Sequence, residues 1–350
     1  MNKTYRLAAA ALMSCGLLIM LPVTASAHVK WFQDDEAYPL ETDLILSWHT
    51  GLLLLVSLGA MGGLYLIQRM LGDRYWPHIR FLDHMSIGAP TLFAVQAAIT
   101  LVHASVQPAL FAPNMELGLT VFGLTIAAIQ VFVALTLITG LYDWVGAIIL
   151  ILLGPLAFFM FPTIDVFEQL LWAGIGVFFL VIGRYSVYPE HARAWFRQYG
   201  EHIGHYAVVT MRVLVGLSFI ALGLGEKLWN PDLGGAFLEE NQYLNVFSEY
   251  FGMDWFTNEL FTLLAGLTEA TIGVLLISGI LTRVVILGMW LPFNLGLPFL
   301  PPQELLGHLP IFGIMYVLLV YNPNRPHSFE SRDEPTVDLP ETTHQPSAPA

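Results

Sequence analysis

Long apolar runs separated by short polar connections fill most of the chain. Runs of about 20 residues, the length that crosses a bilayer as a helix, lie at 44–68, 84–104, 116–138, 144–160, 164–182, 206–224, 258–280, 283–300 and 307–321. The pattern therefore predicts an all-α fold, a polytopic membrane helical bundle with about nine transmembrane helices. Composition agrees, because 56% of the 350 residues are hydrophobic and only 12% are charged, against about 25% charged in soluble domains.

The first 27 residues have the pattern of a secretory signal peptide. Lys3 and Arg6 give a positive start, residues 7–21 an apolar core, and the small residues ending at Ala27 a cleavage site. Cleavage there would leave His28 as the first residue of the mature chain. Residues 1–27 are therefore predicted to be a signal peptide.

The single cysteine, Cys15, lies inside this predicted signal. A mature chain starting at His28 would contain no thiol, which excludes thiolate catalysis and iron–sulfur ligation by its own side chains. Two alternatives compete with cleavage. The segment can remain as an uncleaved helix, or Cys15 can be lipidated, since residues 12–15 resemble a lipobox.

Basic residues give the orientation of the predicted helices. If cleavage places residue 28 outside, only Lys30 and Lys227 fall on the outer side, and the basic residues of the other predicted connections and of the tail fall inside. This asymmetry follows the positive-inside rule. It predicts a multi-pass protein of a bacterial-type inner membrane, with a periplasmic mature N-terminus and a cytoplasmic C-terminus. The inner residues are Arg69, Arg74, Arg80, Arg184, Arg193, Arg197, Arg283, Arg325 and Arg332.

Three segments are predicted not to span the membrane. Residues 28–43 form a periplasmic N-terminal arm, and the proline- and acid-containing residues 322–350 form a disordered cytoplasmic tail. Between them, residues 225–257 carry bulky apolar side chains near helical spacing with acids between them. This pattern predicts an amphipathic helix on the outer membrane surface or over the end of the bundle, acting as an aromatic belt or as a substrate lid.

Arg212 and Glu269 are ionisable residues inside predicted membrane helices. Arg212 is near the start of the helix at 206–224, and Glu269 is in the middle of the antiparallel helix at 258–280. Charges in a bilayer are costly and are candidates for function. They form either a structural ion pair or a catalytic pair in which Glu269 is a proton carrier or quinone-site acid.

The surroundings of these residues form a recognisable pattern. The first helix reads R-x3-G-x2-F-x3-G-x3-K, and the second carries an acid followed by two glycines and an arginine; the residues are Arg212, Gly216, Phe219, Gly223, Lys227, Glu269, Gly273, Gly279 and Arg283. The pattern resembles the DoxX family of small four-helix membrane proteins, which includes the membrane subunit of a thiosulfate:quinone oxidoreductase. The resemblance covers residues 206–321 and implies a DoxX-like four-helix domain after a five-helix membrane domain at 44–205. It also implies a role in quinone-linked redox chemistry with partner redox subunits.

The glycines of this pattern have a physical interpretation of their own. Gly216 and Gly223 are seven residues apart and share one helical face, while Gly273 and Gly279 thin the second helix. In lipid, small residues let helix backbones approach closely. These positions therefore predict helix packing rather than chemistry.

Four histidines, His28, His49, His103 and His308, fall on the predicted outer side. A free N-terminal histidine offers its α-amine and imidazole as a chelate, and one more imidazole from His49, His103 or His308 would suit copper. A bis-histidine haem on His49 and His103 is a further alternative. The arm has a simpler explanation as an interfacial anchor formed by Trp31, Phe32 and Tyr38.

Three functional hypotheses follow from the sequence. The first is a membrane subunit of a quinone-linked redox or respiratory process, with Arg212 and Glu269 as its polar pair. The second is a copper-binding or copper-handling protein centred on His28 at the periplasmic face. The third is a structural or assembly partner without chemistry of its own. All three need the lipid bilayer, and no basic stripe or phosphate-binding loop indicates nucleic acid.

Overall fold

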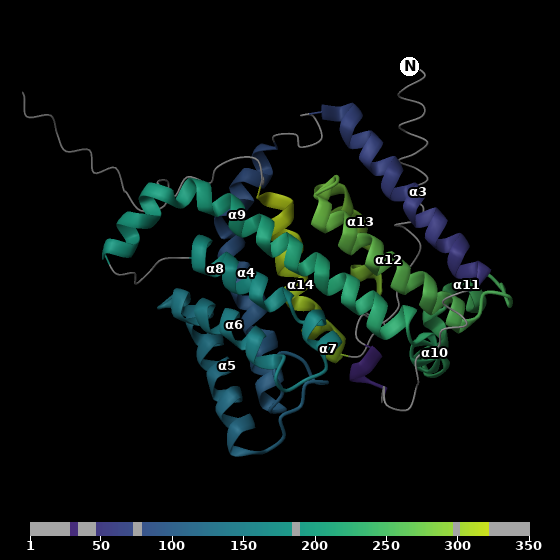
Figure 1. Cartoon of the computed structure of the whole chain (residues 1–350), viewed down its shortest axis with the longest axis horizontal. Helices are drawn as coiled ribbons and strands as arrows, with labels where there is room; N and C mark the ends of the chain where they lie inside the picture. The colour runs from purple at the N-terminus through teal and green to yellow at the C-terminus, as the bar shows by residue number, and fades with distance from the viewer. Residues whose placement is uncertain (1–28, 34–46, 73–78, 184–189, 297–301, 322–350) are drawn as a thin grey trace, which may run out of the picture.

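The computed structural model describes residues 29–33, 47–72, 79–183, 190–296 and 302–321. These residues form helices joined by short turns (Figure 1). The helices before residue 184 are η1 (Val29–Trp31), α3 (Trp48–Leu71), α4 (Arg80–Val106), α5 (Val121–Thr139), α6 (Asp143–Ala157), α7 (Thr163–Glu168) and α8 (Leu171–Ile182).

Local signals set several of these boundaries. The Thr120 side chain accepts a hydrogen bond from the Gly123 amide and so caps the start of α5. The same helix ends at Gly140, whose φ of 70° is left-handed and therefore favours glycine. The Ser47 hydroxyl caps α3 in the same way, through the Thr50 amide.

The second half begins with the long helix α9 (Glu190–Gly223), which continues into a π-helical turn, η4 (Leu224–Leu228). It is followed by α10 (Pro231–Glu240), η5 (Gln242–Leu244), α11 (Val246–Glu249), α12 (Asn258–Ser278), α13 (Thr282–Gly296) and α14 (Pro302–Val320). Pro231 begins α10 because the first helical position needs no amide hydrogen.

Six helices in the described part of the chain are long and apolar enough to cross a membrane. This places the protein among multi-pass helical membrane proteins. The six candidate spans are α3, α4, α5, α7 together with α8, α9 together with η4, and α12. The prediction of nine spans is not confirmed. Asp143–Ala157 and Leu305–Val320 are apolar but shorter, and a 15-residue helix extends only about 22 Å of a hydrocarbon layer of about 30 Å.

The helices of both halves share one hydrophobic core. Helix α9 packs against α12 on one side and α8 on the other, while α14 packs along α4 (Figure 1). Buried side chains from each half, among them Phe93, Phe178, Leu275 and Leu318, belong to the same cluster. The predicted five-helix and four-helix units therefore do not have separate cores.

Glycines mark the crossing of α9 and α12. Gly216 faces Gly273, and Gly223 faces Gly266; a β-carbon built on Gly216 would lie 2.7 Å from the Gly273 carbonyl oxygen. The predicted close approach is therefore confirmed for Gly216, Gly223 and Gly273. Gly279 has a different role, because it ends α12 with a left-handed φ of 73°.

We expect Gly216→Ala to destabilise the protein by about 1–3 kcal/mol, because the added methyl group has to push two backbones apart. The matched control is Gly59→Ala in α3, where nothing lies within 4 Å of an added β-carbon. That change should be neutral or stabilising by up to about 1 kcal/mol through helix propensity. Thermal unfolding of both variants in detergent tests the packing; equal stability would contradict it.

The segment at 225–257 differs from the single amphipathic helix predicted for it. After the end of η4, it contains three short helices, α10, η5 and α11, and the first of these three ends before Asn241. Its apolar side chains gather with Val29 of η1 and Phe261 of α12 in a second cluster, which includes Leu233, Phe237 and Leu244. The segment thus covers the beginning of α12, together with η1. We call the end of the bundle formed by η1, residues 225–257 and the beginning of α12 the arm end.

Candidate functional site

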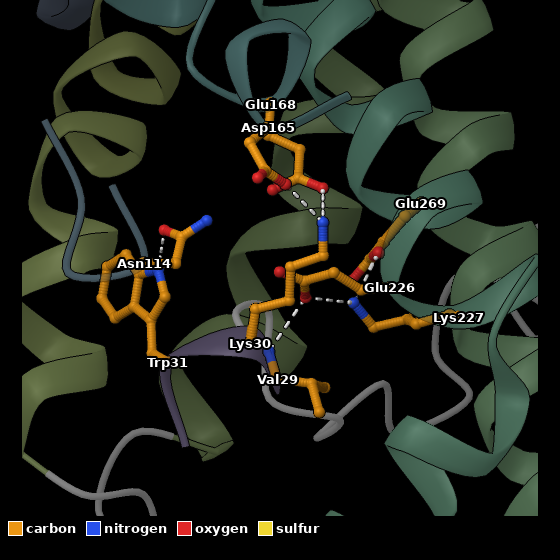
Figure 2. A network of polar contacts seen from close by, with 9 residues as sticks. All are labelled: Val29, Lys30, Trp31, Asn114, Asp165, Glu168, Glu226, Lys227 and Glu269. Atoms are coloured by element: carbon orange, nitrogen blue, oxygen red, sulfur yellow. Dashed lines mark hydrogen bonds and ion pairs between the residues drawn. The ribbon is translucent and has the colours of Figure 1, made fainter. Parts of the chain in front are cut away.

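The first described residues of the chain pack against the bundle at the arm end. The Val29 side chain is buried, and its backbone N–H donates a hydrogen bond of 2.9 Å to Glu226 Oε2 (Figure 2). Trp31 Nε1 donates to Asn114 Oδ1 at 3.2 Å. Phe32 contacts the Phe237 ring. These aromatic side chains therefore have protein partners instead of acting only as lipid anchors, while Tyr38 lies outside the described residues.

Lys30 joins the arm to α7. Its ammonium group lies 2.6 Å from Asp165 Oδ1 and 3.0 Å from Glu168 Oε1, and its side chain is only 5% exposed. The two acids are three residues apart on α7 and so share one face. Burial alone would lower the pKa of Lys30, but attraction to Glu168 and Glu226 and the hydrogen bond to Asp165 raise this pKa above its ordinary value. Lys30 is therefore a stable cation in this site.

A second lysine continues the network towards α12. The Lys227 ammonium group lies 3.0 Å from Glu269 Oε2 and 3.6 Å from Glu226 Oε2 (Figure 2). Glu226 is 0% exposed and Lys227 is 1% exposed. Both residues belong to the π-helical turn η4, a geometry often found at functional sites. The turn thus places two adjacent charged residues in the interior.

A glycine makes room for the α7 carboxylates. A β-carbon built on Gly225 would lie 2.9 Å from Glu168 Oε1 and 2.8 Å from Ile164 Cγ1. These distances are shorter than ordinary contacts. Gly225 therefore lets α7 approach η4 closely enough for Glu168 to reach Lys30.

Carboxylates outnumber ammonium groups in this site. Among the described residues, Asp165, Glu168, Glu226 and Glu269 are joined through two lysines. In addition, Glu226 Oε1 is buried and has no hydrogen-bond partner within the described part of the chain. A cluster with this imbalance has to hold protons or a further cation, because uncompensated charge is costly in the interior. We call these four acids and two lysines the buried ionic network.

Only one of the two catalytic candidates belongs to the network. Glu269 does, but its partner is Lys227 rather than Arg212. The Arg212 guanidinium packs against Gly279 at the end of α12, ten residues or about 15 Å along the helix from Glu269. The predicted Arg212–Glu269 pair is therefore corrected, for a geometric reason: Arg212 lies at the wrong level of α12.

The candidate metal ligands that the structure describes have different neighbours. His28 lies outside the described residues. The His49 ring contacts Trp48, and His308 is buried against Phe293 and Phe312. His103 lies on α4, with Nε2 buried. In the described ranges, no three His, Cys, Asp or Glu side chains are placed to hold a metal ion, so the copper hypothesis depends on His28.

Sequence reasoning missed Lys30, Asp165, Glu168, Glu226 and Lys227 as site residues. A usable signal existed. Lys30 and Lys227 are the two basic residues that depart from the charge asymmetry of the predicted topology, and both are buried in ion pairs. Their position on the outer side of the predicted topology could therefore have identified these two lysines as residues with a specific role.

Comparisons with known proteins add no relative. No family model, no curated protein and no solved structure matches the chain. Fold and site therefore define the class alone: a multi-pass helical membrane protein with a buried ionic network at the arm end of its bundle.

Proposed function

We propose that this protein is a DoxX-like inner-membrane subunit of a quinone-linked redox process, in which the buried ionic network takes up and releases protons. The observation that carries the proposal is the excess of buried carboxylates, four against two lysines in the described residues. Ionisable groups are expensive to keep in a membrane protein. Where buried carboxylates outnumber the cations beside them, some of these carboxylates bind protons, because burial disfavours their charged form.

The arrangement of the motif residues supports the resemblance to DoxX proteins. Lys227 and Glu269, the cation of the first motif and the acid of the second, form an ion pair of 3.0 Å. Gly216 and Gly273, one from each motif, are in contact at the helix crossing. Residues that define the pattern in the sequence thus form one site and its supporting helix contact.

Quinol chemistry needs proton acceptors of this kind. Oxidation of a quinol to a quinone releases two electrons and two protons. In the proposal, a partner redox subunit takes the electrons and the network takes the protons. With a cleaved signal peptide, the arm end faces the periplasm, where the protons would leave. Glu269, the network acid on the membrane helix α12, is the proposed first acceptor.

We expect Glu269→Gln to reduce quinol-dependent electron transfer by about 100-fold, because a positioned proton acceptor contributes about that factor or more. The assay compares quinol oxidation by membranes that contain equal amounts of wild-type and variant protein. The matched control is Glu240→Gln, an exposed acid on α10, which should keep the wild-type rate. Unchanged quinol oxidation in Glu269→Gln together with reduced thermal stability would identify the Lys227–Glu269 pair as structural and reject the proposal.

A further inference from the structure

Residues 246–256, which precede α12, form a closed turn that we call the aromatic turn. At its base, the side-chain amide of Asn245 donates a hydrogen bond of 3.1 Å to the Phe256 carbonyl oxygen. Across the turn, the backbone N–H of Met253 donates to the Phe247 carbonyl oxygen at 3.0 Å. These two bonds join the beginning of the turn to its end. The backbone therefore holds the side chains of the turn in fixed directions.

The rings of the aromatic turn divide into an inner and an outer set. The inner rings, Phe247 and Phe256, have centroids 4.7 Å apart, and both contact the Phe261 ring of α12. They belong to the second hydrophobic cluster at the arm end. The outer rings are about two-thirds exposed: Tyr250 at 67%, Phe251 at 69% and Trp255 at 69%. The turn thus packs one set of rings against the bundle and presents the other set outward.

The outer rings lie close to the point where α12 enters the bilayer. This helix has 21 residues and extends about 31 Å, which matches a hydrocarbon layer of about 30 Å. Its first residue, Asn258, therefore lies at the edge of that layer. Trp255 is three residues earlier, a distance that the chain limits to about 11 Å. The interfacial layer beside the hydrocarbon is about 5–8 Å thick, so the turn lies at the depth of this layer.

A second membrane helix begins at the same level. Near the start of α3, Leu53 packs against the cluster that contains Phe261. Near its end, Gln68 Oε1 accepts a hydrogen bond of 2.8 Å from the Leu281 backbone N–H, just after α12. The two helices therefore run in the same direction, and Figure 1 shows α11 close to both of their first turns. Trp48, the first residue of α3, is 71% exposed and adds an aromatic side chain at this level.

Lipid fits the outer rings better than a protein partner does. An aromatic side chain buries about 150–250 Å² when it is covered, so three rings that are two-thirds exposed offer about 400 Å². A specific protein interface takes about 800 Å² from each partner. Tryptophan and tyrosine, by contrast, are enriched at the membrane–water interface, because their rings are apolar and carry one polar group.

We propose that the aromatic turn is a membrane-interface anchor, in which Tyr250, Phe251 and Trp255 insert into the headgroup region of the bilayer at the arm end. The inner rings of the same turn cover the beginning of α12. Contact with lipid therefore also holds this cover in place. The anchor does not depend on the proposed redox function, and its tests contain no quinol.

The first experiment measures the depth of the turn. Phe251→Cys is made in a Cys15→Ser background, so that the introduced cysteine is the only one in the chain, and is labelled with an environment-sensitive fluorophore. The full-length protein is placed in phosphatidylcholine nanodiscs. We expect emission shifted to shorter wavelength, strong quenching by a phospholipid that carries a nitroxide on its headgroup, and little quenching by aqueous iodide. The controls are Leu58→Cys on the exposed face of α3 for lipid and Glu240→Cys on α10 for water.

Two results of this experiment would overturn the proposal. Iodide quenching of the Phe251 probe that equals quenching of the Glu240 probe would place the turn in water. Protection of the Phe251 probe from both quenchers would show that protein, such as a second copy of this chain, covers the turn.

The second experiment tests whether lipid holds the turn in place. The triple variant Tyr250→Ser/Phe251→Ser/Trp255→Ser changes only side chains that are about two-thirds exposed, so the bundle should still fold. In nanodiscs, backbone amides of residues 246–256 should exchange hydrogen about tenfold faster than in the wild type, the factor for a loss of about 1.4 kcal/mol. Amides in the middle of α12 should keep wild-type protection and serve as the internal control. Wild-type exchange throughout the turn of the variant would reject the anchor.

Discussion

Replacement of Lys30 by methionine is expected to lower the free energy of unfolding by about 3–5 kcal/mol, a large part of a typical protein's stability. Lys30 is the shared cation of Asp165 and Glu168, at 2.6 and 3.0 Å, and its side chain is 5% exposed. Methionine fills a similar volume, so the substitution leaves no large cavity. The loss of stability is therefore due to the uncompensated carboxylates. Unfolding of the detergent-solubilised protein measures it.

Two further variants separate charge from shape. Lys30→Arg keeps the positive charge and should lose less stability than Lys30→Met. The double variant Lys30→Met/Glu168→Gln also removes one of the two carboxylates that Lys30 neutralises, and it should recover part of the lost stability. Mass spectrometry has to show the same mature start in every variant, because Lys30 is close to the predicted cleavage site. A loss below about 1 kcal/mol, typical of exposed ion pairs, would contradict the buried pairing.

The pH dependence of this effect has a defined sign. The pKa of Lys30 is raised in the folded protein above its unfolded value, which is about 10.4. Its ion pairing therefore contributes fully below that pH and is lost as the pH rises through the higher folded pKa. On the alkaline side, the stability difference between wild type and Lys30→Met should therefore begin to fall above about pH 10.

Much of the fold was predictable because its signals are local. The apolar runs predicted where the helices lie, because a membrane helix has apolar side chains along its whole length. The face formed by Gly216 and Gly223 predicted a close helix contact, and both glycines meet α12. The segment at 225–257 was predicted less well. Its apolar spacing is nearly helical, but contacts with Val29 and Phe261 favour three short helices.

The site was harder to predict because its contacts are distant in the sequence. Val29 and Glu226 are 197 residues apart, and Lys30 and Asp165 are 135 apart. No spacing rule connects such positions. Lys227 was assigned to a connection because the apolar run ends at residue 224, whereas η4 continues the helix to Leu228. That additional turn brings Lys227, rather than Arg212, to Glu269.

Lys227→Met is the second change expected to have a large effect, with a loss of about 3–5 kcal/mol in the free energy of unfolding. Lys227 lies 3.0 Å from Glu269 and 3.6 Å from Glu226, and its side chain is 1% exposed. Without this cation, both acids have to be protonated for the protein to stay folded. The loss should therefore decrease at lower pH. Thermal unfolding at several pH values tests this dependence.

A double-mutant cycle decides which cation belongs to Glu269. Lys227→Met combined with Glu269→Gln should show a coupling of about 0.5–3 kcal/mol, because the two side chains are in contact. Arg212→Met combined with Glu269→Gln should be additive within about 0.5 kcal/mol, since Arg212 lies against Gly279, about 15 Å along α12. The reverse result would restore Arg212 as the partner and remove Lys227 from the network. Glu269 would then depend on a cation near the opposite end of α12, and the proton route from Glu269 to the arm would have no connecting residue.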